Sequence, residues 1–273
     1  SVVKEQNAQL AAELNSIKQK NELLQSQLEY YKAQAEYYSK FRKSSAAGEG
    51  LIGNSSVNIV AVREVLENFF EVRYEGVIIR AKVELKRGEG RILINTQPKV
   101  GIDLQTSART AKLVAERFAG VSLEKTDVIL TIIARTEVEV VDGPSAGAAI
   151  TVALISAMLN ETLDESVFMT GTINPDGSVG WVGGILEKAM AASQSGASKF
   201  LIPRGQRVIS IFKPEKKEIA PGVTIVFYRI EKVDVEEHLR ELGYNVKVIE
   251  VGNITEAYNE FTAQQILKAK VES

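Results

Sequence analysis

The chain has 273 residues, of which 45% are hydrophobic and 25% charged, and its formal net charge is −2. This composition predicts one domain with a full hydrophobic core plus an appendage, and the near-neutral charge gives no reason to expect nucleic acid as a partner. The absence of cysteine excludes disulfides and a thiolate nucleophile. No apolar run reaches the length of a membrane span.

Residues 1–43 contain neither Gly nor Pro and repeat apolar side chains at alternating spacings of four and three. This spacing is typical of a coiled-coil helix. With Leu14 at an a position, Asn7 and Asn21 also fall at a, where a buried Asn fixes the register and favours two parallel strands. We therefore predict a homo-oligomer held by residues 1–43. A long helix that packs on its own domain is the alternative interpretation.

Residues 44–56 are rich in Gly, Ser and Ala and predict a flexible linker, which leaves 57–273 as the main domain. The phosphate-binding pattern G-x-x-x-x-G-K-[ST] is absent from this stretch and from the other glycine runs of the chain. The chain begins at Ser1, so the sequence leaves open whether a preceding segment anchors a longer protein to a membrane. The compartment stays open with it.

From residue 57 the pattern becomes rich in strands. Residues 77–85 alternate about an apolar face, and 91–95 are expected to pair back on them as a hairpin after a turn at 87–90. A helix is predicted at about 106–118, and the nearly continuous apolar run 127–134 indicates a strand inside a sheet.

The segment TEVEVVDGPSAGAAITVALISAMLN, residues 136–160, turns from a strand into a buried helix. Pro144 suits a first helical position, and Ser145 then lies among unpaired N–H groups at the positive end of the helix. Negative charge on Ser145, or on a carbonyl that it attacks, would be stabilised there. A small serine that only caps the helix is the alternative. Glu137 and Glu139 lie on one face of the strand that precedes this turn. They are either solvated or in contact with the residues around Ser145 and its substrate.

Residues 168–196 predict a strand, a turn at Asn174-Pro175-Asp176-Gly177, a second short strand and a helix that follows Gly183-Gly184. Lys188 lies on this helix beside its apolar stripe, which predicts partial burial. Burial and the positive end of the helix both lower the pKa of a lysine, so Lys188 could act as a general base. A lysine that snorkels at the edge of the core is the alternative.

These motifs, DGPSAG, MTG and GGILEKAMAA, resemble the proteolytic domain of the Lon protease family, in an archaeal-type form without the ATPase module. The resemblance covers about residues 57–205 and 244–267, and the 43-residue separation of Ser145 and Lys188 agrees with it. It implies a serine-lysine dyad of Ser145 and Lys188. It also implies that Thr170 orients the lysine and that Asp142 is a neighbour of the site.

The resemblance further implies polypeptide substrates and a ring of proteolytic domains. Lon proteases usually carry an ATPase module ahead of this domain, whereas the present chain has no nucleotide loop. We therefore expect cleavage without an ATPase of its own, or an unfoldase supplied by another chain.

Residues 207–243 depart from the family pattern and are interpreted as an insertion without an assigned function. A charged loop is expected at 213–222, a strand at 223–230 and a helix at 235–242. The only histidine, His238, lies in this helix, which makes a Ser-His-acid triad unfavourable and excludes a two-histidine metal site. No cofactor or metal is expected.

The sequence thus predicts a mixed α/β fold, a sheet of largely parallel and hairpin strands with packed helices, preceded by a coiled coil. The predicted function is peptide-bond hydrolysis by a serine endopeptidase. A catalytically silent binding or scaffold protein is the first alternative. A small-molecule kinase, in which GPSAGAA begins a phosphate-binding helix, is a weaker one because no set of Mg²⁺ ligands is apparent.

Overall fold

The computed structural model describes residues 50–68, 71–96, 99–134, 140–141, 143–220 and 223–271, together with single residues of the N-terminal segment. The chain divides into two units, Ser1–Ser44 and Ser45–Ser273, and the second unit carries the fold described below. The described residues of the first unit are helical and exposed: Lys18, Asn21, Gln25, Leu28 and Lys32. The rest of the predicted coiled coil lies outside the described residues, so its heptad interpretation stays a prediction.

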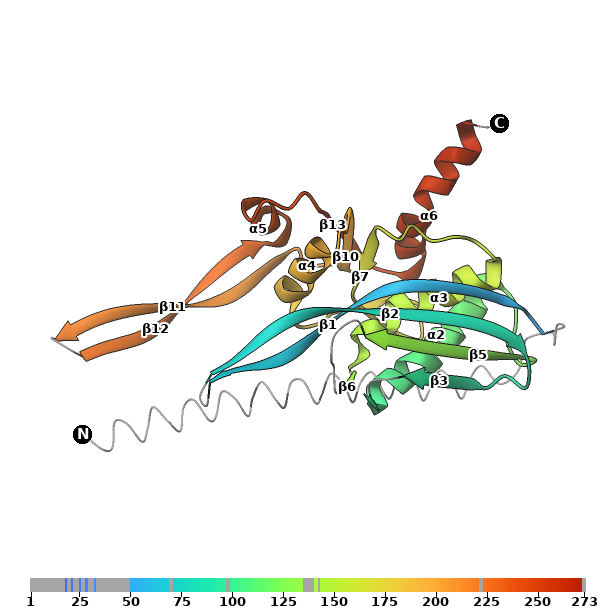
Figure 1. Ribbon diagram of the computed structural model, residues 1–273, viewed down its shortest axis with the longest axis horizontal. Helices are drawn as coiled ribbons and strands as arrows, with labels where there is room; N and C mark the ends of the chain where they lie inside the picture. Colours follow the sequence, from blue (N-terminus) through green and yellow to red (C-terminus); the bar gives the residue numbers. More distant parts are fainter. Residues whose placement is uncertain are drawn as a thin grey trace. The chain divides into compact units, whose positions relative to one another are not determined.

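Within the described residues, the central sheet has seven strands and mixes both pairing directions, which confirms the predicted mixed α/β class (Figure 1). The long strands β1 and β2 form an antiparallel hairpin, and β2 also pairs antiparallel with β5. The other neighbours in the sheet run parallel. Across the sheet the strands are β13 (Lys247–Val251), β10 (Lys199–Pro203), β7 (Val167–Met169), β1 (Gly53–Asn68), β2 (Glu71–Arg87), β5 (Thr126–Ala134) and β3 (Ile92–Thr96).

Helices cover both faces of this sheet, because its strands bury alternate side chains on opposite sides. In β7, Val167 and Met169 join one hydrophobic core while Phe168 joins the other. The first core contains buried side chains of α2 (Ile102–Ala119), α3 (Gly147–Leu159) and α6 (Ile254–Val271). The second contains those of α4 (Ile185–Gln194) and α5 (Val235–Glu241). The helix with Ser145 at its start and the helix with Lys188 therefore pack on opposite faces of the sheet.

Short elements surround the predicted nucleophile. The 3-10 helix η1 (Pro144–Ala146) leads directly into α3. Two small pairs of strands complete this region: β4 (Lys99–Val100) with β6 (Val140–Val141), and β8 (Thr172–Ile173) with β9 (Val179–Gly180). Among the described residues, no helix is long and apolar enough to cross a membrane.

The predicted hairpin between residues 77–85 and 91–95 is wrong. β3 pairs parallel with β5 instead, with Ile92 opposite Val128. The turn at 88–91 is held by the Asp127 carboxylate, which accepts the backbone N–H groups of Glu89 and Arg91 at 2.9 Å each. Arg91 also forms an ion pair with Asp127 at 3.0 Å, and its guanidinium lowers the pKa of that carboxyl to about 2. These contacts direct the chain past β2 to the far side of β5.

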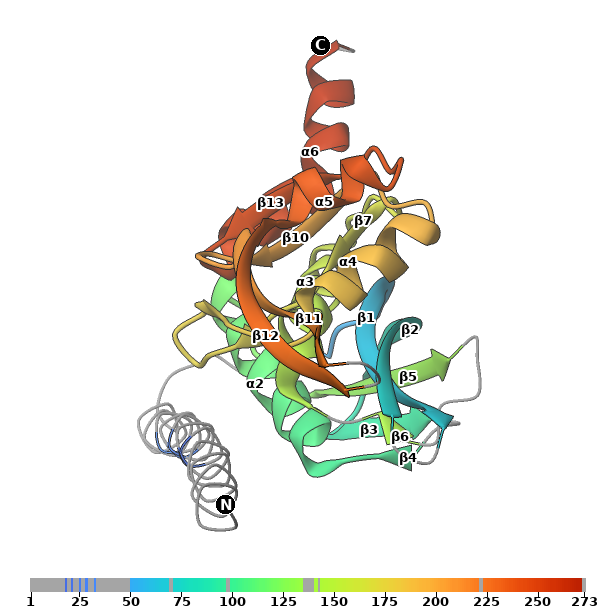
Figure 2. The same ribbon diagram turned by 90° about the vertical axis from the view of Figure 1, so that its left-hand side faces the viewer.

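The charged loop predicted at 213–222 is also wrong over most of its length, because β11 (Val208–Ala220) continues through it and pairs with β12 (Val223–Asp234). Both strands of a two-stranded ribbon are edges, where a proline such as Pro214 is tolerated. Charged residues pair across the ribbon, with Lys213 and Glu231 3.1 Å apart. Figure 1 shows this hairpin as a ribbon that projects from the region of α5 and β10. In Figure 2 it is viewed from the side of its tip.

Candidate active site

The turn before Ser145 has the backbone geometry that the sequence predicts. Gly143 has φ +101°, a value that side-chain-bearing residues rarely adopt, and Pro144 begins η1 directly after it. Ser145 is half-buried and Ala146 is buried, and α3 continues from Gly147. The serine thus lies in the first turn of a helical segment, where backbone N–H groups and the helix dipole favour negative charge.

The end of β7 holds this turn in place. Gly171 donates its N–H to the Ser145 carbonyl oxygen at 2.9 Å, and Ala148 donates to the Gly171 carbonyl oxygen at 3.1 Å. The hydroxyl of Thr170, which is fully buried, also donates to the Ser145 carbonyl oxygen at 3.4 Å. The structure therefore brings Thr170 and Ser145 together. Asp142, Glu137 and Glu139 lie outside the described residues.

Two glycines make this close approach possible. A Cβ on Gly147 would lie 2.7 Å from Cγ2 of Ile173 and 3.2 Å from its backbone nitrogen. A Cβ on Gly171 would lie 2.6 Å from Cγ1 of Val179. The two carbon–carbon distances, 2.7 and 2.6 Å, are below normal carbon–carbon contact. The glycines of GPSAG and MTG are therefore needed for the strand end to reach the turn.

Lys188 is buried on α4, with only 3% of its surface exposed. Its helical neighbours Ile185, Ala189 and Ala192 belong to the second hydrophobic core, as the position of the lysine beside the apolar stripe predicts. Burial lowers the pKa of Lys188 from 10.5 to about 8, against a smaller opposing effect of the Glu187 charge. A substantial fraction of the side chain is therefore neutral near physiological pH.

The serine and lysine elements both contact β1, although they pack on opposite faces of the sheet. β7 pairs with β1 at one position, Ile59 with Met169. After Met169, Thr170 donates its N–H to the Leu201 carbonyl of β10 at 3.1 Å, and Gly171 donates its N–H to the Ser145 carbonyl. The end of β7 therefore lies beside both β1 and the Ser145 turn.

Two residues at the loop before α4 were not singled out by the sequence analysis: Trp181 lies in this loop, and Gln206 contacts it from the loop between β10 and β11. Trp181 is 68% exposed, yet its indole N–H donates to the Arg204 carbonyl at 2.8 Å and its ring lies against Gly205. The amide of the buried Gln206 forms two hydrogen bonds with the backbone of Val182, at 2.8 and 3.1 Å. Trp181 is the only tryptophan of the chain, which could have drawn notice to it; nothing local marks Gln206.

His238 is half-buried on α5, a helix that contacts α4. Among the described residues, no cluster of His, Asp and Glu is arranged to hold a metal ion. A serine at the start of a helical segment can act as a nucleophile, and a buried lysine of lowered pKa can act as a base, so this domain contains both groups that a serine hydrolase without histidine requires.

Comparison with known proteins relates part of the chain to one family. Residues 99–229, which include Ser145, Thr170 and Lys188, match the family described as Lon protease (S16) C-terminal proteolytic domain. This part of the chain, just under half of its length, is therefore similar to the proteolytic domain of the Lon serine peptidases. The match extends into the segment from residue 207 that the sequence analysis treats as an insertion.

Relatives come from bacteria, archaea and mitochondria. The chain is 33% identical over 147 residues to the Lon protease of Phenylobacterium zucineum (strain HLK1), covering 52% of this chain and 18% of that protein. It is 27% identical over 146 residues to the archaeal Lon protease of Thermococcus kodakarensis, covering 54% of this chain and 22% of that protein. To the mitochondrial Lon protease homolog of Yarrowia lipolytica it is 46% identical over 63 residues, covering 23% and 5%. The chain thus spans less than a quarter of the length of these relatives.

Proposed function

We propose that this chain is a serine endopeptidase in which Ser145 is the nucleophile and Lys188 the general base. The observation that carries the proposal is the burial of Lys188, which lowers its pKa to about 8. An ordinary lysine is protonated at neutral pH and cannot accept the proton of a serine hydroxyl. Lys188 can do so in its neutral form, and α4 and the helical segment that carries Ser145 each contact β1.

In the proposed mechanism, neutral Lys188 accepts the proton of the Ser145 hydroxyl while the oxygen attacks a peptide carbonyl. The resulting ammonium group then donates its proton to the leaving amine, and water hydrolyses the acyl-enzyme. The N–H groups of Gly147 and Ala148 already donate to the carbonyl oxygens of Pro144 and Gly171. Binding of the oxyanion therefore falls to the N–H groups before them, at Ser145 and Ala146.

Thr170 has a positioning role in this proposal. Its hydroxyl donates to the Ser145 carbonyl, and the oxygen keeps lone pairs that can accept a hydrogen bond from the Lys188 ammonium group. One buried side chain would then set the distance between nucleophile and base. Asp142, which the family resemblance places near the lysine, stays part of the proposal as a neighbour of the dyad.

The proposed substrates are polypeptides, and we expect cleavage of an unfolded one without nucleotide, since no phosphate-binding loop occurs in this sequence. Proteolysis of a disordered protein by the purified chain should proceed at the same rate with and without ATP and Mg²⁺. A strict ATP requirement would contradict this part of the proposal. It would not contradict the proposed roles of Ser145 and Lys188.

The dyad itself is tested by labelling and by substitution. A fluorophosphonate should modify Ser145 alone, as read by peptide mass spectrometry, and should lose its target in Ser145→Ala. Lys188→Ala should abolish both labelling and peptide cleavage. The peptidase activity of the double variant should be no lower than that of either single variant, because nucleophile and base act as a unit. Lys188→Arg should be inactive, since guanidinium stays protonated. Unlabelled Ser145 in a folded chain would favour a catalytically silent binding protein.

A further inference from the structure

One face of the β11–β12 hairpin carries four large apolar side chains at neighbouring positions. Phe212 lies directly opposite Ile230, and Tyr228 and Val226 follow at alternate positions of β12, so these side chains share one face of the ribbon. Phe212 and Ile230 are each 65% exposed and Tyr228 is 67% exposed. A two-stranded hairpin is only marginally stable by itself, and here its large apolar side chains are left in water. We call this surface, Phe212, Val226, Tyr228 and Ile230, the apolar face.

The opposite face of the hairpin combines two ion pairs with apolar side chains, among them Ile225 and Phe227, which are 47% and 43% exposed. Lys213 and Glu231 form an ion pair at 3.1 Å, and Arg229 and Glu215 form another at 3.3 Å. These cations and anions are equal in number, so the ribbon presents little net charge to a partner. A partner of the apolar face is therefore selected by apolar contact and backbone pairing rather than by charge.

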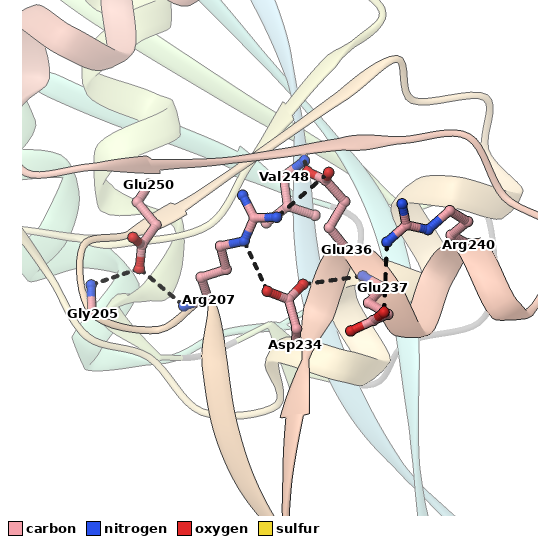
Figure 3. Close-up of polar contacts among 8 residues, drawn as sticks. All are labelled: Gly205, Arg207, Asp234, Glu236, Glu237, Arg240, Val248 and Glu250. Carbon is pink, nitrogen blue, oxygen red and sulfur yellow. Dashed lines mark hydrogen bonds and ion pairs between the residues drawn. The ribbon is translucent and has the colours of Figure 1, made fainter.

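The root of the hairpin is fastened to the domain by side chains (Figure 3). Arg207, just before β11, binds Asp234 at the end of β12 at 3.0 Å and Glu236 at 3.5 Å. One carboxylate oxygen of Glu250, on β13, accepts the N–H groups of Gly205 and Arg207 at 2.8 and 3.0 Å. Contacts from both strands and from β13 hold the ribbon at a defined place on the domain.

The residues just before the root also contact the loop that precedes α4. Gln206, the residue before Arg207, holds the backbone of Val182 through its amide, and the Arg204 carbonyl holds the indole of Trp181. This loop leads through Gly183 and Gly184 into the helix that carries Lys188. The apolar face therefore begins a few residues from contacts that position the entry to α4.

We propose that the apolar face and the outer edges of β11 and β12 bind an extended apolar segment of a polypeptide substrate and hold it while another segment is cleaved at Ser145. This inference rests on the proposed function. An extended, unfolded polypeptide fits because it offers apolar side chains at alternate positions and unpaired backbone groups, which an edge strand can bind. The attachment of the root to the loop before Lys188 argues for a substrate in preference to an unrelated partner.

The kinetic test compares a long substrate with a short one. In Phe212→Ser/Tyr228→Ser, the KM for unfolded casein should rise about tenfold, the change expected when one well-buried contact is lost. An internally quenched hexapeptide is too short to reach the hairpin, so its kcat/KM should stay within twofold, which also shows that the variant is folded. The matched control is Lys213→Ser/Glu231→Ser, which removes an ion pair from the opposite face and should leave both substrates unchanged. An unchanged KM for casein in the apolar-face variant would overturn the proposal.

A binding test separates this proposal from the proposed function. In a Ser145→Ala background, the Kd for fluorescently labelled casein should weaken about tenfold with the apolar-face substitutions and stay constant with the control pair. Hairpin-dependent binding by a chain that cleaves nothing would support the hairpin site and contradict the peptidase. Light scattering on the same variants gives the remaining outcome: if the apolar-face substitutions lower the mass of the particle, the face binds a second copy of the chain, and the substrate proposal is wrong.

Discussion

Gly171 donates its backbone N–H to the carbonyl oxygen of Ser145 at 2.9 Å, which ties the end of a central strand to the turn that presents the candidate nucleophile. The reciprocal bond from Ala148 to Gly171 closes the link from the other side. Because β7 is itself held between β1 and β10, the position of Ser145 is determined by the sheet rather than by a surface loop. Such rigid support is what preorganised catalysis requires.

The buried hydroxyl of Thr170 extends this link, so Thr170→Val should reduce activity without unfolding the chain. Valine keeps the shape but loses the bond to Ser145, and we expect kcat to fall by at least tenfold with KM nearly unchanged. The free energy of unfolding should fall by about 1–2 kcal/mol. Thr170→Ser keeps the hydroxyl and should recover most of the activity. If valine and serine behaved alike, Thr170 would have only a packing role.

The adjacent glycines before α4 provide a matched pair of substitutions. Gly184 has φ +67°, and a Cβ there would lie 2.6 Å from Cγ2 of Val62. Its carbonyl also accepts the N–H of Lys188 at 3.0 Å, so a shift of this residue displaces the start of the lysine helix. Gly184→Ala should cost about 1–3 kcal/mol and most of the peptidase activity.

Gly183→Ala is the control, because a Cβ at this position meets nothing within 4 Å and its φ lies outside the left-handed region. Its stability should stay within about 0.5 kcal/mol of the parent chain, as for most surface changes. Thermal denaturation and the kcat/KM of a short peptide measure both variants. Equal losses in the two would mean that the pair acts through loop flexibility and not through the fit of Gly184 against β1.

Local sequence pattern predicted the parts of this molecule that local physics determines. The turn at Gly143-Pro144 follows from the backbone preferences of these residues, and the burial of Lys188 follows from its helical spacing to Ile185 and Ala192. The pairing of β3 with β5 did not follow, because it depends on Asp127 binding a turn 36 residues earlier in the chain. No short-range pattern contains that contact.

The two strands of the β11–β12 hairpin illustrate the same limit. The charged run after Lys213 was interpreted as a loop because charges are usually solvated, whereas in the structure Lys213 and Glu215 pair with Glu231 and Arg229 of the opposite strand. The hydrogen bonds between the Gln206 amide and the Val182 backbone likewise join residues 24 positions apart. The residues of the proposed dyad could be predicted from a motif, but the contacts around them required the fold.

The lowered pKa of Lys188 predicts how activity depends on pH. Below about pH 8 the lysine is mostly protonated, so kcat/KM for a short peptide should rise about tenfold per pH unit and level off above about pH 8. The hexapeptide profile, measured between pH 5 and 10 in buffers of constant ionic strength, checks this. A flat profile across pH 7 to 9 would contradict the role of Lys188 as general base.

The same pKa has a consequence for stability. The unfolded chain binds the lysine proton more tightly, so the free energy of unfolding should rise as pH increases from about 8 to 10.5. Below about pH 8 the burial of this group costs about 3 kcal/mol, and Lys188→Met should remove that cost. Urea unfolding at pH 7 and pH 10 is the measurement. The advantage of Lys188→Met should be large at pH 7 and small at pH 10, and an equal difference at both would exclude a titrating lysine as its cause.

The heptad pattern of residues 1–43 predicts that subunits associate through this segment. Light scattering should give a lower mass, or a weaker concentration dependence, for a chain that begins at Gly53 than for the full chain. Asn21→Leu places an apolar side chain at an a position and should strengthen the association, with a change in strand number as a further expected result, because the buried Asn is what favours two strands. A Lys18→Gln variant is the control, since an e position lies at the margin of the seam. If the truncated and full-length chains had the same mass at every concentration and the same peptidase rate, residues 1–43 would be a spacer or an intramolecular support.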